Sequence, residues 1–124
     1  MIEAGKTTFT QEIIVEHKDT AAVYGSGKLE VFATPAMVAL MENTAIRSLE
    51  GLLEPDTDTV GIEINTQHIK ATAIGQKVTC KATVIEVDGR RIRFEIDAWD
   101  EKGQIGHAIH DRFVINPVKF MSKL

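Results

Sequence analysis

Several features are scarce or missing in this chain of 124 residues, and each absence removes a class of protein. The single cysteine, Cys80, cannot form a disulfide within the chain, so a disulfide-stapled secreted fold is excluded. No apolar run approaches the ~18 residues of a membrane-spanning helix. Fourteen basic residues against eighteen acidic ones give a net charge of -4. This balance does not favour nucleic acid as a partner, because such binding relies on clustered lysine and arginine.

The rest of the composition is typical of a globular domain, with 44% hydrophobic and 26% charged residues. The length suffices for one hydrophobic core and is too short for two ordinary domains, so we expect residues 1–124 to form a single domain. The first residues, Met1 to Gly5, lack a signal-peptide pattern. We therefore expect a cytoplasmic protein that has no membrane partner.

The most informative segment is a nearly all-apolar stretch that predicts a long buried helix from Pro35 to Leu53. Thr34 is a suitable N-cap, because its hydroxyl can accept a hydrogen bond from an unpaired first-turn N–H. Proline suits the first helical position that follows. Pro55 should end the helix, since the residue before a proline tends to leave the helical region.

Five strand-like stretches accompany this helix, one before it and four after it. They are Thr7–Val15, Thr59–Ile69, Lys77–Val87, Arg91–Trp99 and Gln104–Asn116. Asp88-Gly89 is a strong hairpin signal, and Asp19–Lys28 is expected to be a loop. The order β-α-β-β-β-β predicts an α+β hotdog fold, a long central helix wrapped by an antiparallel sheet. Such a sheet leaves edges through which subunits pair, so we expect a homodimer, with assembly into a tetramer left open.

One carboxylate, Glu42, interrupts the apolar helix. A buried carboxylate costs free energy unless it is paired or functional, which makes Glu42 a candidate site residue. The alternative is a glutamate at the helix rim that reaches solvent. The sequence leaves both interpretations open.

A second candidate, His68, shares a strand face with Ile62 and Ile64, so we expect it to point toward the helix. A histidine beside an apolar face is more often structural than catalytic. Here, however, the facing helix offers the hydroxyl of Thr34 and the carboxylate of Glu42. Hydroxyl, carboxylate and imidazole are the parts of an acyl-transfer site, in which each can serve as nucleophile, base or orienting group.

The spacing on the helix limits how these groups combine. Eight helical residues rise roughly 12 Å, so Thr34 and Glu42 of one helix cannot easily hydrogen-bond each other. Either the chain before Pro35 folds back, or the working groups come from two subunits. We favour the second arrangement, a composite site at a dimer interface.

Several motifs resemble those of one hotdog family. They are Val31-Phe32-Ala33-Thr34, Leu40-Met41-Glu42, Gly61 with His68, Val87 to Arg91, and Ile105 to Arg112. In these motifs the chain is similar to the fluoroacetyl-CoA thioesterase-like family, and the resemblance spans about residues 6–120. It implies hydrolysis of an acyl-CoA thioester with Thr34, Glu42 and His68 as catalytic residues and Gly61 as a substrate-contacting glycine. Coenzyme A is then part of the substrate, and no separate cofactor is implied.

One departure concerns the loop before the helix. Gly25-Ser26-Gly27-Lys28 is small and polar, whereas the fluoroacetate-specific member of the family has aromatic residues there. The resemblance therefore implies thioester hydrolysis, but it does not imply a preference for the fluorinated substrate. It does not identify the acyl group, and it does not decide whether Glu42 acts as nucleophile or base.

Residues of the last predicted strand add weaker candidates. Arg112 shares a face with His110 and Val114, from which it could reach the rim of the site or a phosphate of coenzyme A. A surface ion pair is the alternative. His107 and His110 fall on opposite faces of the strand, and with a single cysteine we expect no metal site.

Two other functions stay open on the same fold. A non-catalytic acyl-CoA-binding hotdog domain would have the same pattern with an inert site. A hotdog hydratase is disfavoured, because its Asp-x-Asn-Pro-x-His motif is absent.

Overall fold

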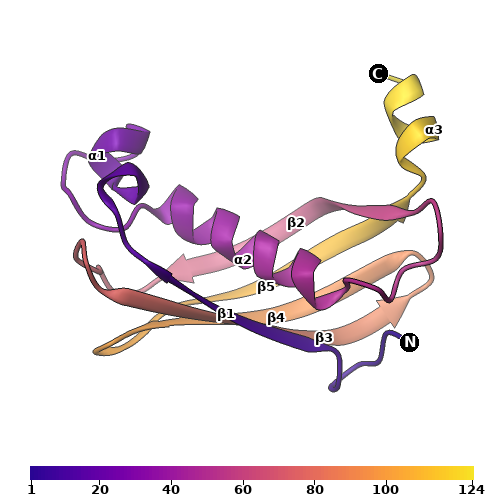
Figure 1. The fold of residues 1–124 in the computed structure, drawn as a ribbon, viewed down its shortest axis with the longest axis horizontal. Coiled ribbons are helices and arrows are strands. Elements are labelled where there is room, and N and C mark those ends of the chain that lie inside the picture. The colour runs from indigo at the N-terminus through magenta and orange to yellow at the C-terminus, as the bar shows by residue number, and fades with distance from the viewer.

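A five-stranded antiparallel sheet curves around one long helix in the computed structural model, which describes residues 1–124 (Figure 1). The elements are β1 (Thr8–Ile14), η1 (His17–Asp19), α1 (Ala21–Tyr24), α2 (Thr34–Ser48), β2 (Asp58–His68), β3 (Lys77–Asp88), β4 (Arg91–Asp100), β5 (Gly103–Ile115) and α3 (Pro117–Ser122). Each predicted strand is confirmed to within one residue at either end. The α+β hotdog architecture is confirmed as well.

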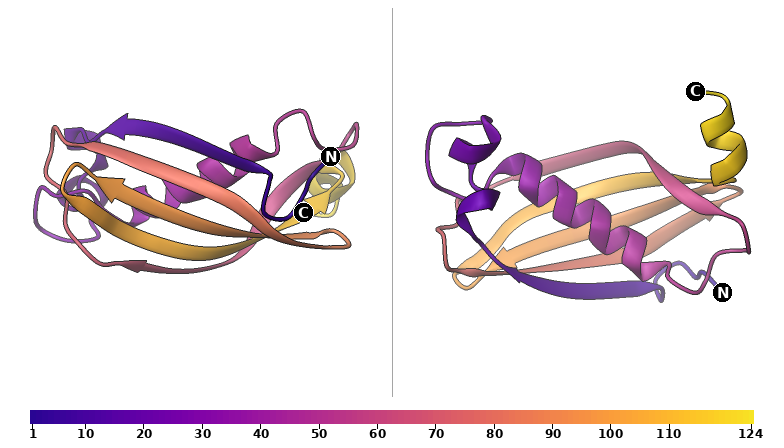
Figure 2. Two further views of the ribbon diagram at one scale, coloured as in Figure 1. Left: turned by 90° about the horizontal axis from the view of Figure 1, so that it is seen from below. Right: turned by 45° about the horizontal axis from the view of Figure 1, so that its top comes forward.

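The strand order β1-β3-β4-β5-β2 makes β1 and β2 the edges of the sheet. Helix α2 lies across the concave face, as the two views of Figure 2 show. The residues of β3 and β4 alternate between the two faces of the sheet, and those that point inward are buried. These are Val78, Cys80, Ala82, Val84, Ile92, Phe94, Ile96 and Ala98. They join the apolar side of α2 in a single core cluster of 19 residues, so sheet and helix are held together by burial of shared apolar surface.

Strand β2 is irregular at its middle. Its pairing with β5 shifts between Gly61 and Glu63, so that Ile62 is an extra residue, as in a β-bulge. The Ile62 side chain is 53% exposed. Our prediction that Ile62 faces the core is therefore wrong, whereas Ile64 does pack against the core cluster.

Helix α2 differs from the prediction at both ends. It stops at Ser48 rather than Leu53, because Gly51 (φ 76°) turns the chain with a left-handed conformation that glycine adopts readily. At the other end the N-cap is Ala33, which makes no side-chain cap hydrogen bond. The prediction that Thr34 caps the helix is wrong, since its hydroxyl has another partner.

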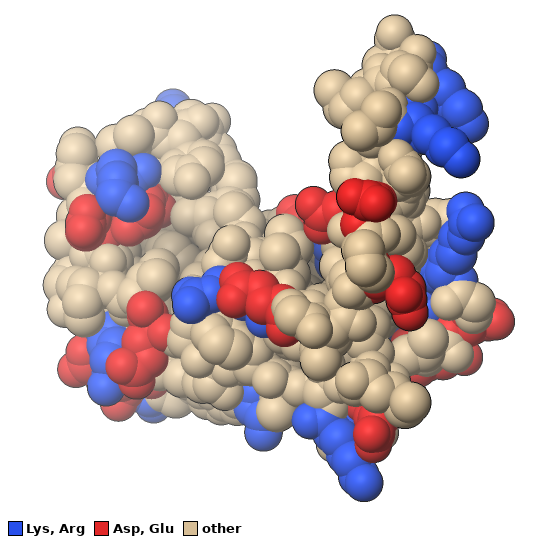
Figure 3. Space-filling model, turned by 45° about the vertical axis from the view of Figure 1, so that its right-hand side comes forward, with Lys and Arg blue, Asp and Glu red and all other residues tan.

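Two short helical segments replace part of the predicted loop 19–28. Thr20 begins α1 by accepting a hydrogen bond from the Val23 N–H, and Gly25 ends it at φ 78°. At the C-terminus, Asn116 caps α3, which buries none of its residues and projects from the body (Figures 1 and 3). On the face shown in Figure 3, acidic and basic residues are interspersed. None of the helices has the length and hydropathy needed to cross a bilayer.

Candidate active site

The first residue of α2 and the last residue of β2 meet. The Thr34 hydroxyl lies 2.8 Å from Nδ1 of His68. The alternation of β2 turns His68 toward the helix, and the Phe32 ring stands edge-on to the imidazole with centroids 6.4 Å apart. The hydroxyl is exposed, whereas Nε2 of His68 is buried and has no hydrogen-bond partner. In this hydroxyl–imidazole pair the Thr34 side faces solvent and the Nε2 side of His68 is closed.

The surroundings of His68 favour its neutral form. Burial lowers the pKa of His68, and the backbone of Lys70 opposes that shift. A neutral imidazole that carries its proton on Nε2 has Nδ1 free to accept from the Thr34 hydroxyl. The pair therefore has the arrangement of a general base and the hydroxyl it contacts.

Glu42 lies two turns farther along α2 and belongs to a different cluster. Its Oε2 is 3.5 Å from Nη1 of Arg112 and 3.9 Å from Nε2 of His110. The Glu42 side chain keeps 38% exposure, while the side chains of Arg112 and His110 keep 6% and 1%. Glu42 is thus a half-buried carboxylate that faces solvent on one side and a buried cation on the other.

Hydrogen bonds fix every member of this second cluster. His110 donates from Nδ1 to the Glu63 carbonyl at 2.7 Å, which leaves Nε2 to accept from Nη1 of Arg112 at 3.1 Å. Burial and the nearby Arg112 lower the pKa of His110, so its approach to Glu42 is not an ion pair. Arg112 also donates to the hydroxyl and the carbonyl of Thr59, at 2.8 and 3.1 Å. Arg112 therefore has a fixed position from which it orients the Glu42 carboxylate.

Gly61 lies directly beneath this carboxylate. A Cβ at Gly61 would come within 2.7 Å of Oε2 of Glu42 and within 3.2 Å of Nη1 of Arg112. Any larger residue would have to displace the Glu42 side chain. The glycine is needed because the backbone of β2 and the carboxylate of α2 approach so closely.

The structure thus brings the predicted residues together in two groups rather than one. Thr34 pairs with His68, and Glu42 joins Gly61 and Arg112. Thr34 and Glu42 do not hydrogen-bond each other, as the helical rise predicts. The surface ion pair considered for Arg112 is wrong, because this residue is 5% exposed.

Sequence reasoning missed His110 as part of the site. The only role considered for it was that of a metal ligand with His107. A usable signal was present, because His110 and Arg112 alternate onto one face of the strand and both are polar where neighbouring inward residues are apolar.

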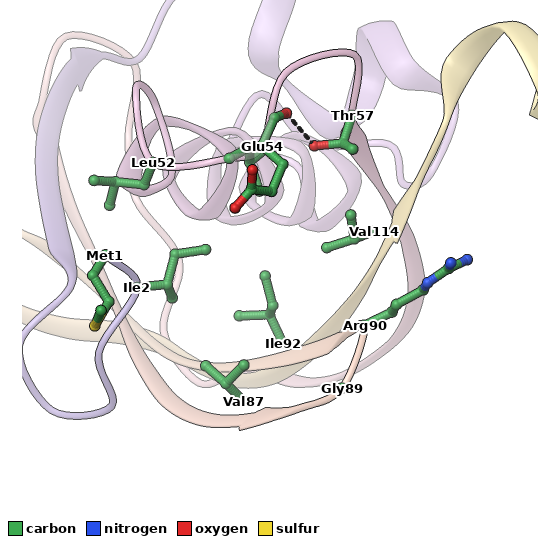
Figure 4. A pocket seen from close by; sticks show the side chains of 11 residues that line it. Met1, Ile2, Leu52, Glu54, Thr57, Val87, Gly89, Arg90, Ile92 and Val114 are labelled. Carbon is green, nitrogen blue, oxygen red and sulfur yellow. Dashed lines mark hydrogen bonds between the residues drawn. The ribbon is translucent and has the colours of Figure 1, made fainter.

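A cavity of about 500 Å³ lies elsewhere, at the far end of α2 (Figure 4). Its walls are mainly apolar, with Ile2, Leu52 and Ile92 among them. Its one hydroxyl, on Thr57, donates to the Glu54 carbonyl at 2.6 Å. Because this hydroxyl is bound to a backbone carbonyl rather than to a base, we place the candidate active site by its chemistry at the two clusters. Glu42, Gly61 and His110 line a smaller cavity of about 220 Å³.

Known proteins share this fold and sequence. The family described as fluoroacetyl-CoA-specific thioesterase, FlK, matches residues 15–118. A fluoroacetyl-CoA thioesterase from Streptantibioticus cattleyicolor is 36% identical over 122 residues, which cover 94% of this chain and 88% of that protein. The structure of a FlK mutant in complex with fluoroacetate and CoA has a TM-score of 0.90 at 34% identity, covering 96% of this chain and 99% of the other.

A hot-dog-like protein from Thermanaerovibrio acidaminovorans has a TM-score of 0.90 at 24% identity, covers 98% and 90% of the two chains, and shares the fold. Fold and sequence together define the class, a thioester hydrolase with the hotdog fold. The chain belongs to the fluoroacetyl-CoA-specific thioesterase family. The family resemblance inferred from the motifs is confirmed.

Proposed function

We propose that this protein hydrolyses a small acyl-CoA thioester to the free acid and coenzyme A, using Thr34, Glu42 and His68. The observation that carries the proposal is the 2.8 Å contact between the Thr34 hydroxyl and Nδ1 of His68. It places a neutral base beside a hydroxyl at the start of a 15-residue helix. Backbone N–H groups at such a helix start favour an oxyanion, the charge that develops as a thioester carbonyl is attacked.

The site is completed, in this proposal, by a second copy of the chain. Glu42 lies two helical turns from Thr34, but both clusters border the unpaired edge strand β2, one at Gly61 and the other at His68. When two copies of an edge strand pair antiparallel about a twofold axis, each residue faces one at the mirrored position. An axis at Asn65 pairs Gln67 with Glu63 of the partner subunit and, because Ile62 is an extra residue, sets His68 opposite Gly61 of the partner subunit. That pairing brings Glu42 of the partner subunit toward Thr34 and His68.

Two chemical routes fit this composite site. In one, the Glu42 carboxylate attacks the thioester carbonyl, CoA leaves as the thiolate, and water then hydrolyses the mixed anhydride. In the other, Glu42 or neutral His68 takes a proton from water as the water attacks, and that proton passes to the departing thiolate. In both routes the Thr34 hydroxyl turns its proton from Nδ1 of His68 to the carbonyl oxygen and anchors it, which leaves Nδ1 free to accept a proton.

Gly61 and Arg112 support these roles in different ways. Gly61 gives the substrate a close approach to the β2 backbone beside Glu42, as predicted for a substrate-contacting residue. Arg112, which we predicted at the rim or on a coenzyme A phosphate, is too buried for the phosphate role. We assign it instead to holding the Glu42 carboxylate in its orientation.

Thiol release from a panel of short acyl-CoA and aryl-CoA thioesters tests the activity. Because the loop Gly25–Lys28 has no aromatic residue, we expect acetyl-CoA to be hydrolysed at least as well as fluoroacetyl-CoA. A strong preference for the fluorinated thioester would show that selectivity comes from another part of the site. Tight binding of the whole panel without thiol release would support the non-catalytic acyl-CoA-binding alternative.

Mixed dimers test the composite site. Glu42→Gln and His68→Ala each inactivate every site of their own homodimer. If each site takes these residues from different subunits, one site of a mixed dimer is intact, and randomised mixtures recover about a quarter of wild-type activity. A mixture that stays as inactive as its components would place both residues in one protomer. A mixture of Glu42→Gln with Gly61→Ala is a useful control, because these two changes affect the same cluster.

A further inference from the structure

A third cluster, in which hydrogen-bond donors surround the buried Asp100 carboxylate, lies outside the two groups described above. Asp100, at the end of β4, has a side chain that is 0% exposed. Both of its oxygens lie 2.7 Å from the Lys70 ammonium, and Oδ2 also accepts from the Thr72 hydroxyl at 2.9 Å. The backbone N–H groups of Lys102 and Gly103 donate to Oδ1. The proposed reaction uses none of these groups, yet five donor contacts converge on one carboxylate.

This cluster holds the ionised carboxylate firmly. Burial alone would raise the pKa of Asp100, but Lys70, the Lys102 N–H and Thr72 bring it down to about 2. Asp100 therefore remains charged throughout the neutral range, and breaking the cluster would leave an unpaired buried charge. A group bound this tightly can fix the chain segments attached to it.

One attached segment leads to His68. Lys70 and Thr72 follow His68 directly after the end of β2, and the Ile69 N–H donates to the Ile105 carbonyl at 2.8 Å. The Lys70 backbone is also the group that raises the pKa of His68 against the effect of burial. By contacting Lys70 and Thr72, Asp100 fixes the position of the backbone beside the His68 imidazole.

The other attached segment leads to Thr34. The Thr72 carbonyl accepts from the Phe32 N–H at 2.9 Å, and Val31 forms a bridge with Ala73. Phe32 contacts the His68 ring edge-on and is two residues from Thr34. Thr72 therefore connects Asp100, which its hydroxyl contacts, to Phe32, which its carbonyl contacts, and so to the segment that leads into Thr34.

We propose that Asp100 is a positioning residue for the Thr34–His68 pair, acting through Lys70 and Thr72. Asp100 fixes the segment 69–73, and this segment holds the His68 ring with Nδ1 toward Thr34 while it anchors Val31 and Phe32, which lead into α2. The role rests on the proposed function of the pair. It differs from a purely structural role, in which Asp100 would only shape the β4–β5 turn through Lys102 and Gly103.

The test combines kinetics with ¹⁵N NMR of the His68 ring, identified by loss of its signals in His68→Ala. In the wild type we expect the tautomer that carries its proton on Nε2. Asp100→Asn should mix the two tautomers and lower kcat by about 10-fold with KM unchanged, because misplacing a base slows the reacting step. Thr72→Val should shift the same signals in the same direction, although it leaves the turn contacts of Asp100 in place.

Asp97→Asn is the matched control. Asp97 lies on the same strand and contacts His107 at 2.8 Å, away from the pair, so this change should leave the His68 tautomer and kcat unaltered. The proposal is overturned if Thr72→Val folds with wild-type kcat and His68 signals, or if Asp97→Asn reproduces the loss. The NMR signals do not depend on turnover. A wild type that hydrolyses no thioester therefore counts against the proposed function, and the tautomer still tests the positioning role.

Discussion

The two clusters along β2 are built in opposite ways. In the Glu42 cluster, Arg112 and His110 are buried and their ring and guanidinium nitrogens contact named partners. In the other, an exposed Thr34 hydroxyl meets an imidazole whose Nε2 has no partner. Many hydrogen bonds on one group fix its orientation, whereas a single contact leaves a group free to exchange a proton. A fixed orientation therefore distinguishes the Glu42 cluster, whereas freedom to exchange a proton distinguishes Thr34 and His68.

The strongest test of this division is to remove one group from each cluster. Glu42→Gln should lower kcat by about 100-fold or more, as expected for loss of a general base, and His68→Ala should be similarly severe. Both variants should stay folded, which circular dichroism would check. Near-normal hydrolysis by Glu42→Gln would contradict the role of Glu42 as nucleophile or base. His68 or bound water would then carry the reaction.

A smaller effect is expected from the hydroxyl itself. Thr34→Ala should lower kcat by about 10-fold, less than loss of the base, because water or a backbone N–H can partly replace an oxygen anchor. Thr34→Ser keeps the hydroxyl and should recover most of the rate. A Thr34→Ala loss as large as that of His68→Ala would instead make the hydroxyl the attacking group.

Gly61→Ala disturbs the Glu42 cluster without removing any functional group. The added Cβ would meet the end of the flexible Glu42 side chain, so we expect that carboxylate to swing away while the sheet stays intact. The expected result is a several-fold loss of kcat, roughly that of a misplaced base, with little change in melting temperature. Unchanged kcat in a variant whose crystal structure shows a displaced Glu42 would contradict its catalytic role.

The acid limb of the dependence of rate on pH should report the protonation of His68. Burial lowers the pKa of His68 below the ordinary value of 6.5, and the neutral ring is the active base. The rate should therefore hold as pH falls to 6.5 and decline only below it, where the ring takes up a proton. Measuring kcat/KM across the acid range and titrating His68 by NMR should give the same midpoint. A midpoint above 6.5 would show that another group controls the acid limb.

Much of this fold is readable from the sequence, because alternation and burial coincide in the strands. Residues such as Val78 and Phe94 follow the period of two, and every strand boundary agrees to within one residue. The helix end was misjudged because Gly51 acts through its backbone conformation, which takes effect before Pro55 is reached.

The site was harder to predict, since its contacts cross between elements. Local rules assign Thr34 to capping the helix, and only the tertiary structure shows that its hydroxyl contacts His68 instead. The same holds for Arg112, whose guanidinium donates to Thr59, a residue far away in the sequence and on another strand. The residue types of a site can be picked from a sequence in this way, but their partners cannot.

The bulge in β2 has one further consequence. Gly61 and His68 are separated by an odd number of positions, so in a regular strand they would point to opposite sides of the sheet. The extra residue, Ile62, reverses the parity of the strand: odd-numbered positions face α2 before it and even-numbered positions after it. Both clusters keep their common side because Ile62 is bulged out of the ladder rather than paired in it. If Ile62 were paired regularly, every candidate side chain would remain in the chain and yet one of the two clusters would point to the wrong side. Deleting Ile62 would instead leave six positions between Gly61 and His68, and a regular strand would hold both on the same side.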